Sequence, residues 1–423
     1  MMAISRLYCS RPSLGEANPF SRTPAALPSP FEPMISNNIP TLAAERKPIV
    51  VWSATRTCNL NCTHCTSDSR LLPYPGQLST AEAQVMIEDL AQFGVPALVF
   101  SGGEPLMYPD LPELIAHARG LGICPALSTN ATLITPAVAA DLKRVGVAYV
   151  GVSLEGLGPT NDYFRGKNGA FDTALAGLRN SVAAGLRVGL RMTLTRRNFH
   201  GLEAIFDFIA REKIHRACFH HLVYGGRGND MLKDDLTHEQ TRQAMNIILR
   251  RAADFYRRGR DIEILTADNL VDGVYLYLKI LKKDPARAAE VYRLLKWNGS
   301  GAYGSGVGIS GIDHQGNVHA DPFWSSHTFG NVRGRPFSEI WTDLSDPLMA
   351  GLKDPLPRLK GCCATCHWTE LCGGGSRVRA ERVYGDPWMP DPACYLTSDE
   401  LRRDLPDRAD KMADALLWNE LAA

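Results

Sequence analysis

The sequence has no excess of either charge and no long hydrophobic run. It holds 46 Lys and Arg residues against 45 Asp and Glu residues, which gives a formal net charge of +1. Proteins that attract nucleic acid or an anionic membrane surface through their overall field carry a clear positive excess, so we expect neither partner. No stretch approaches the roughly 20 apolar residues that cross a bilayer, and no apolar secretion signal opens the chain. We therefore expect a cytoplasmic protein.

Most of the chain has the composition of a folded protein. Hydrophobic residues make up 45% and charged residues 22%, as in ordinary globular domains. The length of 423 residues suits one large domain, alone or with an appendage. Residues 1–46 differ, because they contain many Pro and Ser and show no hydrophobic period. We expect a disordered extension there; the alternative, an organelle-targeting peptide, would need an amphipathic helix that is not evident.

The sequence contains eleven cysteines, and most of them are clustered. The cytosol keeps thiols reduced, so clustered cysteines in a cytoplasmic protein indicate metal ligands or catalytic thiols rather than disulfides. One group lies near the start of the folded region, a second lies near the C-terminus, and three cysteines are isolated. These sets are Cys58, Cys62 and Cys65; Cys362, Cys363, Cys366, Cys372 and Cys394; and Cys9, Cys124 and Cys218.

From residue 47 to residue 225, short β-rich runs alternate with helical patterns. Ser79 and Glu82 have the spacing of a capping box at the start of the first helix. Alternating strands and helices with short connections predict a parallel sheet covered by helices. Six such units predict an α/β fold with a partial (β/α)6 TIM-like barrel, whose chemistry is expected where the strands end. The expected strands are 49–54, 97–100, 123–128, 148–153, 187–194 and 217–223.

The second half of the chain has a different pattern. Residues 226–298 are expected to form a helical connecting region, with helices at 237–258 and 268–297. A glycine-rich tract at 299–311 leads into residues 312–318, which are typical of a hairpin with glycine at the turn. We expect a smaller domain over residues 299–400 and a helical tail over residues 401–423.

The first cysteine group follows the first expected strand. The thiolates of Cys58, Cys62 and Cys65 can converge on one side of a loop and hold three irons of a cubane, leaving the fourth iron open for a small chelating ligand. The alternative is a structural zinc site. Zinc normally takes four protein ligands, and His64 is the nearby candidate for the fourth.

A second motif, Gly102-Gly103-Glu104, follows the second expected strand and should therefore lie beside the cysteine loop. Glycines let a backbone approach a ligand closely, and a carboxylate can accept a hydrogen bond from an ammonium group. Taken alone, these residues could equally form a simple turn.

Together, the two motifs resemble the radical S-adenosylmethionine (radical SAM) superfamily, over residues 48–225. The resemblance implies a [4Fe–4S] cluster held by Cys58, Cys62 and Cys65, with SAM chelating the open iron. It also implies an external electron donor, such as a ferredoxin or flavodoxin. The residues that it assigns to SAM binding are Gly102, Gly103, Glu104, Ser128, Asn130, Ser153, Glu155 and Arg191. For Arg191, an ordinary ion pair inside the barrel is the alternative.

By ligand type, the four thiolates of Cys363, Cys366, Cys372 and Cys394 could bind zinc or an iron–sulfur cluster. Beside a radical SAM motif, they resemble the SPASM or twitch extension, which implies one auxiliary [4Fe–4S] cluster. Cys362 is then a spare residue, a core residue or an alternative ligand.

Several segments resemble the NirJ group of heme d1 biosynthesis proteins: residues 224–228, 316–324, 330–333, 336–341, 372–374, 377–380 and 385–395. That resemblance implies action on a tetrapyrrole, 12,18-didecarboxysiroheme, with removal of propionate side chains. Because this substrate is a flat polyanion, we expect arginines at the mouth of the barrel, and the candidates are Arg165, Arg191 and Arg227. His319 is a candidate ligand for the substrate iron, although a hydrogen-bonded histidine without such a role is the more common case.

Three alternatives remain. A related enzyme of the alternative heme pathway would remove acetates from didecarboxysiroheme or decarboxylate coproheme. A SPASM peptide maturase usually carries a leader-binding N-terminal domain, for which residues 1–46 are too short and too rich in proline. An iron–sulfur electron carrier would leave Gly102, Gly103 and Glu104 without a purpose.

Overall fold

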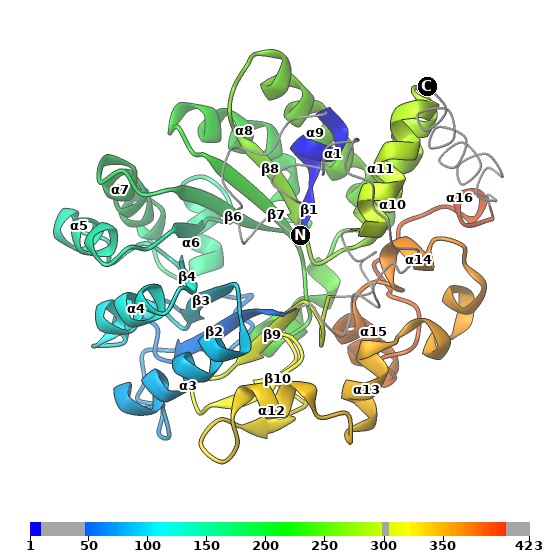
Figure 1. Ribbon diagram of the computed structural model, residues 1–423. Helices are drawn as coiled ribbons and strands as arrows, with labels where there is room; N and C mark the ends of the chain where they lie inside the picture. The colour runs from blue at the N-terminus through cyan, green and yellow to red at the C-terminus, as the bar shows by residue number, and fades with distance from the viewer. Residues whose placement is uncertain (10–46, 298–303, 403–423) are drawn as a thin grey trace, which may run out of the picture.

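The computed structural model describes residues 1–9, 47–297 and 304–402 (Figure 1). Its strands form one 11-stranded sheet in the order β1-β8-β7-β6-β5-β4-β3-β2-β9-β10-β11. The six parallel strands predicted from the sequence are confirmed and are neighbours in chain order. They are β2 (Ile49–Thr55), β3 (Ala97–Gly102), β4 (Cys124–Thr129), β5 (Tyr149–Ser153), β6 (Val188–Leu194) and β7 (Arg216–His221).

Helices connect these strands and cover the outer face of the sheet (Figure 1). The first helix begins at the predicted capping box, in which Ser79 and Glu82 bind each other's backbone, and ends at Gly94 with a φ of 85°. The covering helices are α3 (Thr80–Phe93), α4 (Leu111–Gly120), α5 (Pro136–Arg144), α6 (Pro159–Arg165), α7 (Ala170–Ala183) and α8 (Leu202–Arg211).

The two faces of the curved sheet differ in chemistry, because side chains alternate along each strand. Residues such as Trp52, Phe100 and Phe219 point outward into the main hydrophobic core beneath the helices. Their neighbours in sequence, such as Ser101 and His220, line a cavity on the inner face instead. The barrel interior is therefore partly polar, as a binding site requires.

The region expected to be a helical connection, residues 226–298, also contributes a strand. Strand β8 (Glu263–Ala267) pairs in parallel with β7 and extends the barrel by one strand. The predicted helices are present around it, although the second is interrupted. They are α9 (His238–Arg257), α10 (Val271–Leu281) and α11 (Pro285–Trp297), preceded by the 3-10 segment η3 (Gly226–Asp234).

Residues 1–9 do not form part of a disordered extension, so the prediction for residues 1–46 fails there. Strand β1 (Met2–Ala3) pairs antiparallel with β8, and helix α1 (Ile4–Cys9) follows it. Ile4 and Leu7 are 0% and 3% exposed, because they pack into the main core. Residues 10–46 lie outside the described residues.

The expected C-terminal domain, residues 299–400, starts as a continuation of the barrel sheet. Strand β9 (Ile309–Ile312) pairs in parallel with β2 and forms the predicted hairpin with β10 (Asn317–His319), turning at Gly316 with a φ of 86°. The remaining elements are β11 (Gly330–Asn331), α12 (Phe337–Thr342), α13 (Pro347–Lys353), η4 (Leu356–Arg358), η5 (Gly361–Thr365), α14 (Thr369–Cys372), α15 (Arg377–Tyr384) and α16 (Ser398–Leu401). The expected helical tail lies outside the described residues from 403 onward.

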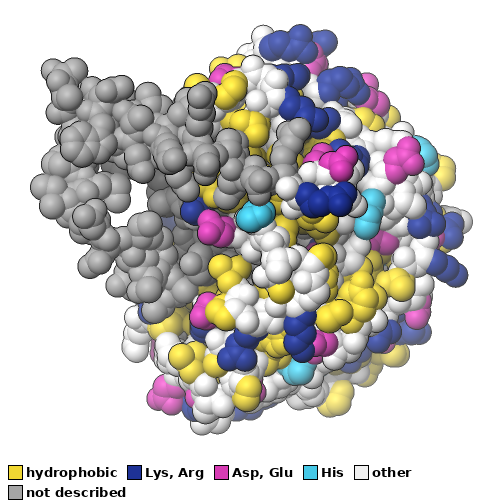
Figure 2. Space-filling view, turned by 90° about the vertical axis from the view of Figure 1, so that its right-hand side faces the viewer, with side chains coloured by type: hydrophobic (Ala, Val, Ile, Leu, Met, Phe, Trp, Pro, Cys, Tyr) yellow, Lys and Arg dark blue, Asp and Glu magenta, His cyan; other side chains and the backbone are white. Residues whose placement is uncertain are grey.

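The surface agrees with the balanced composition. Figure 2 shows Lys and Arg side chains interspersed with Asp and Glu side chains over the face in view. Among the helices of residues 1–9, 47–297 and 304–402, none has the length and apolar character needed to span a membrane.

Candidate functional site

A cavity of about 420 Å³ occupies the inside of the barrel. Most site residues predicted from the sequence line it, although they come from the ends of different strands. These are Cys58, Cys62, Cys65, Gly102, Gly103, Ser128, Asn130, Ser153, Glu155, Arg165, Arg191 and Arg227. Glu104 and His319 are the exceptions among the candidates for this site.

Each thiol of the first cysteine group faces a hydrogen-bond donor. Asn130 Nδ2 lies 3.9 Å from Cys58 Sγ, Arg165 Nη1 lies 3.5 Å from Cys62 Sγ, and the backbone N–H of Ser69 lies 3.3 Å from Cys65 Sγ. Donors of this kind stabilise thiolates. Burial raises the pKa of Cys58 to about 12 and also raises that of Cys62, against the opposing effect of Arg165. Metal coordination would overcome these raised pKa values, because a coordinated thiol loses its proton.

This donor set fits an iron–sulfur cluster better than a single zinc ion. Within the described ranges, no group of three or more His, Cys, Asp or Glu side chains is arranged to hold one metal ion. In a cubane cluster each cysteine binds a different iron, so the thiolates stand farther apart than the ligands of one zinc ion do. His64, the expected fourth zinc ligand, directs Nε2 to Glu155 Oε1 at 3.0 Å instead.

The two glycines of the second motif are required by a close backbone contact. A Cβ atom on Gly102 would lie 2.1 Å from the carbonyl oxygen of Thr55, and one on Gly103 would lie 2.3 Å from that of Thr57. The N–H of Gly103 donates to the Thr55 oxygen at 2.7 Å. The glycines therefore join the end of β3 to the start of the cysteine loop, and their backbone still lines the cavity.

Glu104 follows the two glycines and is bonded within the protein. Its side chain is 0% exposed and does not line the cavity. It accepts hydrogen bonds from Thr129 Oγ1 at 2.7 Å, from the N–H of Asn130 at 2.9 Å and from the N–H of Leu106 at 3.2 Å. Burial raises the pKa of Glu104 to about 7, while these hydrogen bonds oppose the shift. Its side chain therefore anchors the end of β4, and the predicted contact of Glu104 with the ammonium group of SAM stays a prediction.

Glu155, at the end of β5, is the centre of a buried ionic network. Oε1 accepts from His64 and Arg165, each at 3.0 Å, and Oε2 accepts from the N–H of Thr193 at 2.6 Å. Burial alone would raise the pKa of Glu155. The opposing effect of His64 and Arg165 is larger and lowers this pKa to about 2. The carboxylate is therefore ionised and holds the cysteine loop against the barrel.

The guanidinium groups of Arg165 and Arg227, both predicted to bind the substrate, are paired with groups of the protein. Arg165 spans Glu155 and Cys62. Arg227 donates to the carbonyl oxygens of Cys62 and Ser69 at 2.7 and 3.0 Å and to Asp68 at 2.6 Å. Both arginines line the cavity, but their charge is used to hold the cysteine loop.

His319 lies outside the cavity. It lies on β10, where Nδ1 is 2.6 Å from the carbonyl oxygen of His327 and Nε2 is 3.5 Å from Asp313 Oδ2. The side chain is buried and does not line the cavity. Both ring nitrogens therefore face protein groups, His327 and Asp313, and a role in binding a substrate iron stays a prediction.

A chain of polar contacts along the cavity wall includes two residues, His220 and Asp268, that were not predicted from the sequence. Arg191 donates to Ser128 Oγ at 2.5 Å and to His220 Nε2 at 3.3 Å, and His220 Nδ1 lies 2.7 Å from Asp268 Oδ2. Alternation along β7 would have placed His220 on the inner face together with Cys218. Asp268 follows β8, so it could not be placed while that strand was unrecognised.

The second cysteine group lies close together. Burial raises the pKa of Cys363 to about 12 and that of Cys394 to about 11. Burial also raises the pKa values of Cys366 and Cys372, and the thiols of this group raise one another's pKa. As for the first group, no three of these side chains are arranged around one metal ion in the described part of the chain. The four thiols therefore fit a cluster, in which each binds a different iron, better than a single zinc ion. Cys362 is exposed.

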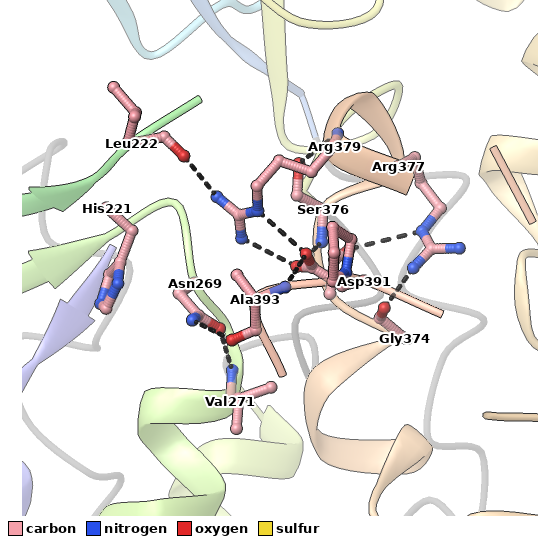
Figure 3. Close-up of polar contacts among 12 residues, drawn as sticks. His221, Leu222, Asn269, Val271, Gly374, Ser376, Arg377, Arg379, Asp391 and Ala393 are labelled. Atoms are coloured by element: carbon pink, nitrogen blue, oxygen red, sulfur yellow. Dashed lines mark hydrogen bonds and ion pairs between the residues drawn. The ribbon is translucent and has the colours of Figure 1, made fainter. Parts of the chain in front are cut away.

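This group borders the cavity. Gly373, Ser376 and Arg377, which follow Cys372 in the sequence, line the cavity wall. Figure 3 shows how Asp391 fixes this segment, because its carboxylate accepts from the N–H of Ser376 at 2.7 Å.

A buried ion pair joins the same segment to the barrel. The carboxylate of Asp391 binds Arg379 through two hydrogen bonds of 2.9 and 2.8 Å, and Arg379 also donates to the carbonyl oxygen of Leu222, just after β7, at 3.2 Å (Figure 3). Asn269 donates to the carbonyl oxygen of Ala393 at 2.9 Å. The segment that carries Cys372 and Cys394 is thus hydrogen-bonded to the end of the barrel that holds the cavity.

Comparisons with known proteins agree with this arrangement. The family model described as "Radical SAM superfamily" matches residues 52–209. The Fe-coproporphyrin III synthase of Methanosarcina barkeri is 50% identical over 404 residues, covering 95% of this chain and 99% of that protein. The pre-heme d1 synthase of Dinoroseobacter shibae is 43% identical over 376 residues, covering 88% and 90%.

Solved structures share the fold at low identity. SuiB of Streptococcus suis bound to S-adenosylmethionine has a TM-score of 0.64 at 18% identity, covering 83% of this chain and 78% of that one. The enzyme anSMEcpe with bound AdoMet and a peptide also has a TM-score of 0.64, at 16% identity, covering 87% and 99%. From the family match and from relatives that are similar over nearly their whole length, we conclude that the chain belongs to the radical SAM superfamily of enzymes.

Proposed function

We propose that this protein is a radical SAM enzyme of heme biosynthesis that removes carboxylate-bearing side chains from 12,18-didecarboxysiroheme. One observation carries the proposal: a single cavity is lined by Cys58, Cys62, Cys65 and Arg191 and is bordered by the second cysteine group. Relatives named for the synthesis of two iron tetrapyrroles support the substrate class.

In this proposal, Cys58, Cys62 and Cys65 hold a [4Fe–4S] cluster. The backbone of Gly102 and Gly103 and the polar groups of Ser153 and Asn130 bind SAM. When bound, the cluster and SAM supply a 5′-deoxyadenosyl radical that abstracts a hydrogen atom from a substrate carbon. The chain itself binds these partners, orients them and excludes water.

The described residues support this division of labour. The donors of Asn130, Arg165 and Ser69 stabilise the three thiolates. The ionised carboxylate of Glu155 keeps Arg165 and His64 in position beside the loop. Because the cavity lies inside the barrel and residues after Cys372 form part of its wall, a reactive group there would be shielded from solvent.

The second cysteine group would hold one auxiliary [4Fe–4S] cluster on Cys363, Cys366, Cys372 and Cys394. Its position beside the cavity wall suits a role in moving an electron to or from the substrate. An external carrier, such as a ferredoxin or flavodoxin, would supply the reducing electron to the enzyme.

Two outcomes are possible for the same substrate. Coproporphyrin III retains its propionates and carries methyl groups where siroheme carries acetates, so the relative that is 50% identical over 95% of the chain favours removal of acetates. The relative that is 43% identical over 88% of the chain favours the heme d1 outcome, removal of propionates, which the sequence analysis expected. We place acetate removal first, on identity and coverage.

Product mass distinguishes the two outcomes. The reconstituted protein would be incubated anaerobically with SAM, a reductant and didecarboxysiroheme, and 5′-deoxyadenosine and the tetrapyrrole mass would be followed together. Loss of acetate mass supports the first outcome and loss of propionate mass supports the second. Formation of 5′-deoxyadenosine with an unchanged tetrapyrrole would contradict both.

A further inference from the structure

The arginines that line the cavity differ in how their charge is compensated. Three of them each bind a carboxylate at 3.0 Å or less, and a fourth, Arg377, directs its donors to backbone carbonyl oxygens. Arg191 is different, because no carboxylate in the described part of the chain forms an ion pair with it. The three paired arginines are Arg165 with Glu155, Arg216 with Glu263 and Arg227 with Asp68.

Arg191 is nevertheless firmly placed. Its Nη1 donates to Ser128 Oγ at 2.5 Å, and its Nε lies 3.3 Å from His220 Nε2. Gly151 makes room for it, because a Cβ atom there would lie 2.9 Å from Arg191 Cδ. The guanidinium group thus reaches from β6 toward β4 and β7 across the inner face of the barrel. A positioned, partly buried cation without a carboxylate partner is a natural site for an anionic ligand.

His220 provides a second donor beside Arg191. Asp268 lies 2.7 Å from Nδ1, so it orients the ring and leaves Nε2 on the side of Arg191 and the cavity. Although burial lowers the pKa of His220, Cys218 and Asp268 raise it to about 9; the contribution of Cys218 requires an ionised thiol. The observed Arg191–His220 contact suits the neutral ring. Once the ring is protonated, both groups are donors, and an anion between them would accept from both.

We propose that Arg191 and His220, with His220 positioned by Asp268, bind a side-chain carboxylate of the tetrapyrrole. This inference rests on the proposed function, which supplies a substrate with several carboxylates. It assigns a substrate-binding role to His220 and a positioning role to Asp268, and it moves Arg191 from SAM to the substrate.

The location favours the tetrapyrrole over SAM as the source of the carboxylate. The cysteine loop and the glycine motif follow β2 and β3, whereas His220 lies on β7 and Asp268 follows β8, on the other side of the sheet. Arg191 lies between the two sides, because it is in register with Ser153 of β5 and donates to Ser128 of β4. The preference for the tetrapyrrole therefore rests on His220 and Asp268. The C-terminal residues Asp321 and Phe323 also line the cavity. A carboxylate could in principle come from either molecule, so the test must separate the two.

The test measures two dissociation constants on the reconstituted holoenzyme: that of didecarboxysiroheme by absorbance titration, and that of SAM by equilibrium dialysis. The variants are Arg191→Gln and His220→Gln. Their matched controls are Arg187→Gln and His215→Gln, at positions that precede the same two strands and do not line the cavity. We expect each site variant to weaken tetrapyrrole binding by about 10- to 100-fold, as for loss of one charge-assisted hydrogen bond. SAM binding and the controls should stay unchanged.

A methyl-esterified didecarboxysiroheme provides the second arm. The ester lacks the anionic groups, so wild type and both site variants should bind it with the same affinity. Weaker SAM binding in either site variant, or unchanged tetrapyrrole binding in both, would overturn the assignment. A wild-type protein that binds SAM but no tetrapyrrole would instead refute the proposed function, and this inference with it.

Discussion

The guanidinium of Arg165 lies 3.5 Å from Cys62 Sγ and, through its other terminal nitrogen, 3.0 Å from Glu155 Oε1. Both Arg165 and Glu155 are nearly inaccessible to solvent, at 7% and 3% side-chain exposure. The contact links α6, the cysteine loop and the end of β5 in one buried network. Placement of Cys62 therefore depends on a charge balance as well as on loop conformation.

Removing this arginine should weaken the cysteine site. In Arg165→Met, Glu155 keeps His64 but loses its other cationic partner, and breaking a buried ion pair typically costs about 3–5 kcal/mol. We expect a lower iron content per chain and a lower thermal midpoint, measured by iron and sulfide analysis and by anaerobic melting. Arg144→Met is the control, because Arg144 pairs with Asp141 at the exposed surface. Equal iron content in both variants would contradict the prediction.

Asp391 should be essential for the second cysteine group. In Asp391→Asn, the buried Arg379 loses its ionised partner and the N–H of Ser376 loses a strong acceptor. With two [4Fe–4S] clusters, the wild-type chain should hold about eight irons, and the variant about four. Iron analysis and electron paramagnetic resonance of the reduced protein measure this. The control Asp386→Asn, whose partner Lys360 is exposed, should keep the wild-type iron content.

The second cysteine group should contain four ligands and one spare thiol. Cys372 is buried, whereas Cys362 is exposed. We expect Cys372→Ser to lose the auxiliary cluster and Cys362→Ser to retain it, as judged by iron content and by the electron paramagnetic resonance spectrum. If the two variants lost iron equally, Cys362 would have to be counted as a ligand.

Tetrapyrrole binding should depend on pH through His220. Cys218 and Asp268 raise its pKa to about 9, against burial and the nearby Arg191. Because the protonated ring binds the carboxylate, affinity should be full below that pKa and fall as the pH rises through it. In Asp268→Asn, the carboxylate that helps to raise the pKa of His220 is gone, so the affinity for the tetrapyrrole should fall at a lower pH. Dissociation constants between pH 6.5 and pH 10 test this, and an unchanged profile in Asp268→Asn would exclude the positioning role.

The sequence predicts the barrel well because its strands carry strong local signals. Each of the six expected strands is an apolar run bounded by glycine or polar residues, and its neighbour in the sheet is also its neighbour in the chain. Strand β1 was missed because it has only two residues. Strand β8 was missed although it pairs with its chain neighbour β7, because its five residues lie within a region of mainly helical pattern. The hairpin of β9 was predicted, but not the pairing of β9 with β2, since Ile309 and Ile49 are far apart in sequence.

The candidate site could also be predicted only in part from the sequence. Residue type and strand position were enough to predict that the cysteines, the glycines and the polar residues at the strand ends lie around one cavity. The partners of charged residues were not predictable, because they come from distant segments. Arg227 binds Asp68 across 159 positions in the sequence, which is why it looked free for a substrate. For the same reason, Asp268 was not associated with His220.

The most direct test of the account follows the reaction itself. Anaerobic incubation of the reconstituted enzyme with SAM, a reductant and didecarboxysiroheme should yield 5′-deoxyadenosine only when the tetrapyrrole is present, together with a product that has lost acetate side chains. If the product had lost propionates instead, the proposed substrate would be right, but the reaction would belong to heme d1 synthesis. If 5′-deoxyadenosine formed while the mass of the tetrapyrrole stayed the same, the superfamily assignment would stand and the proposed substrate would be wrong.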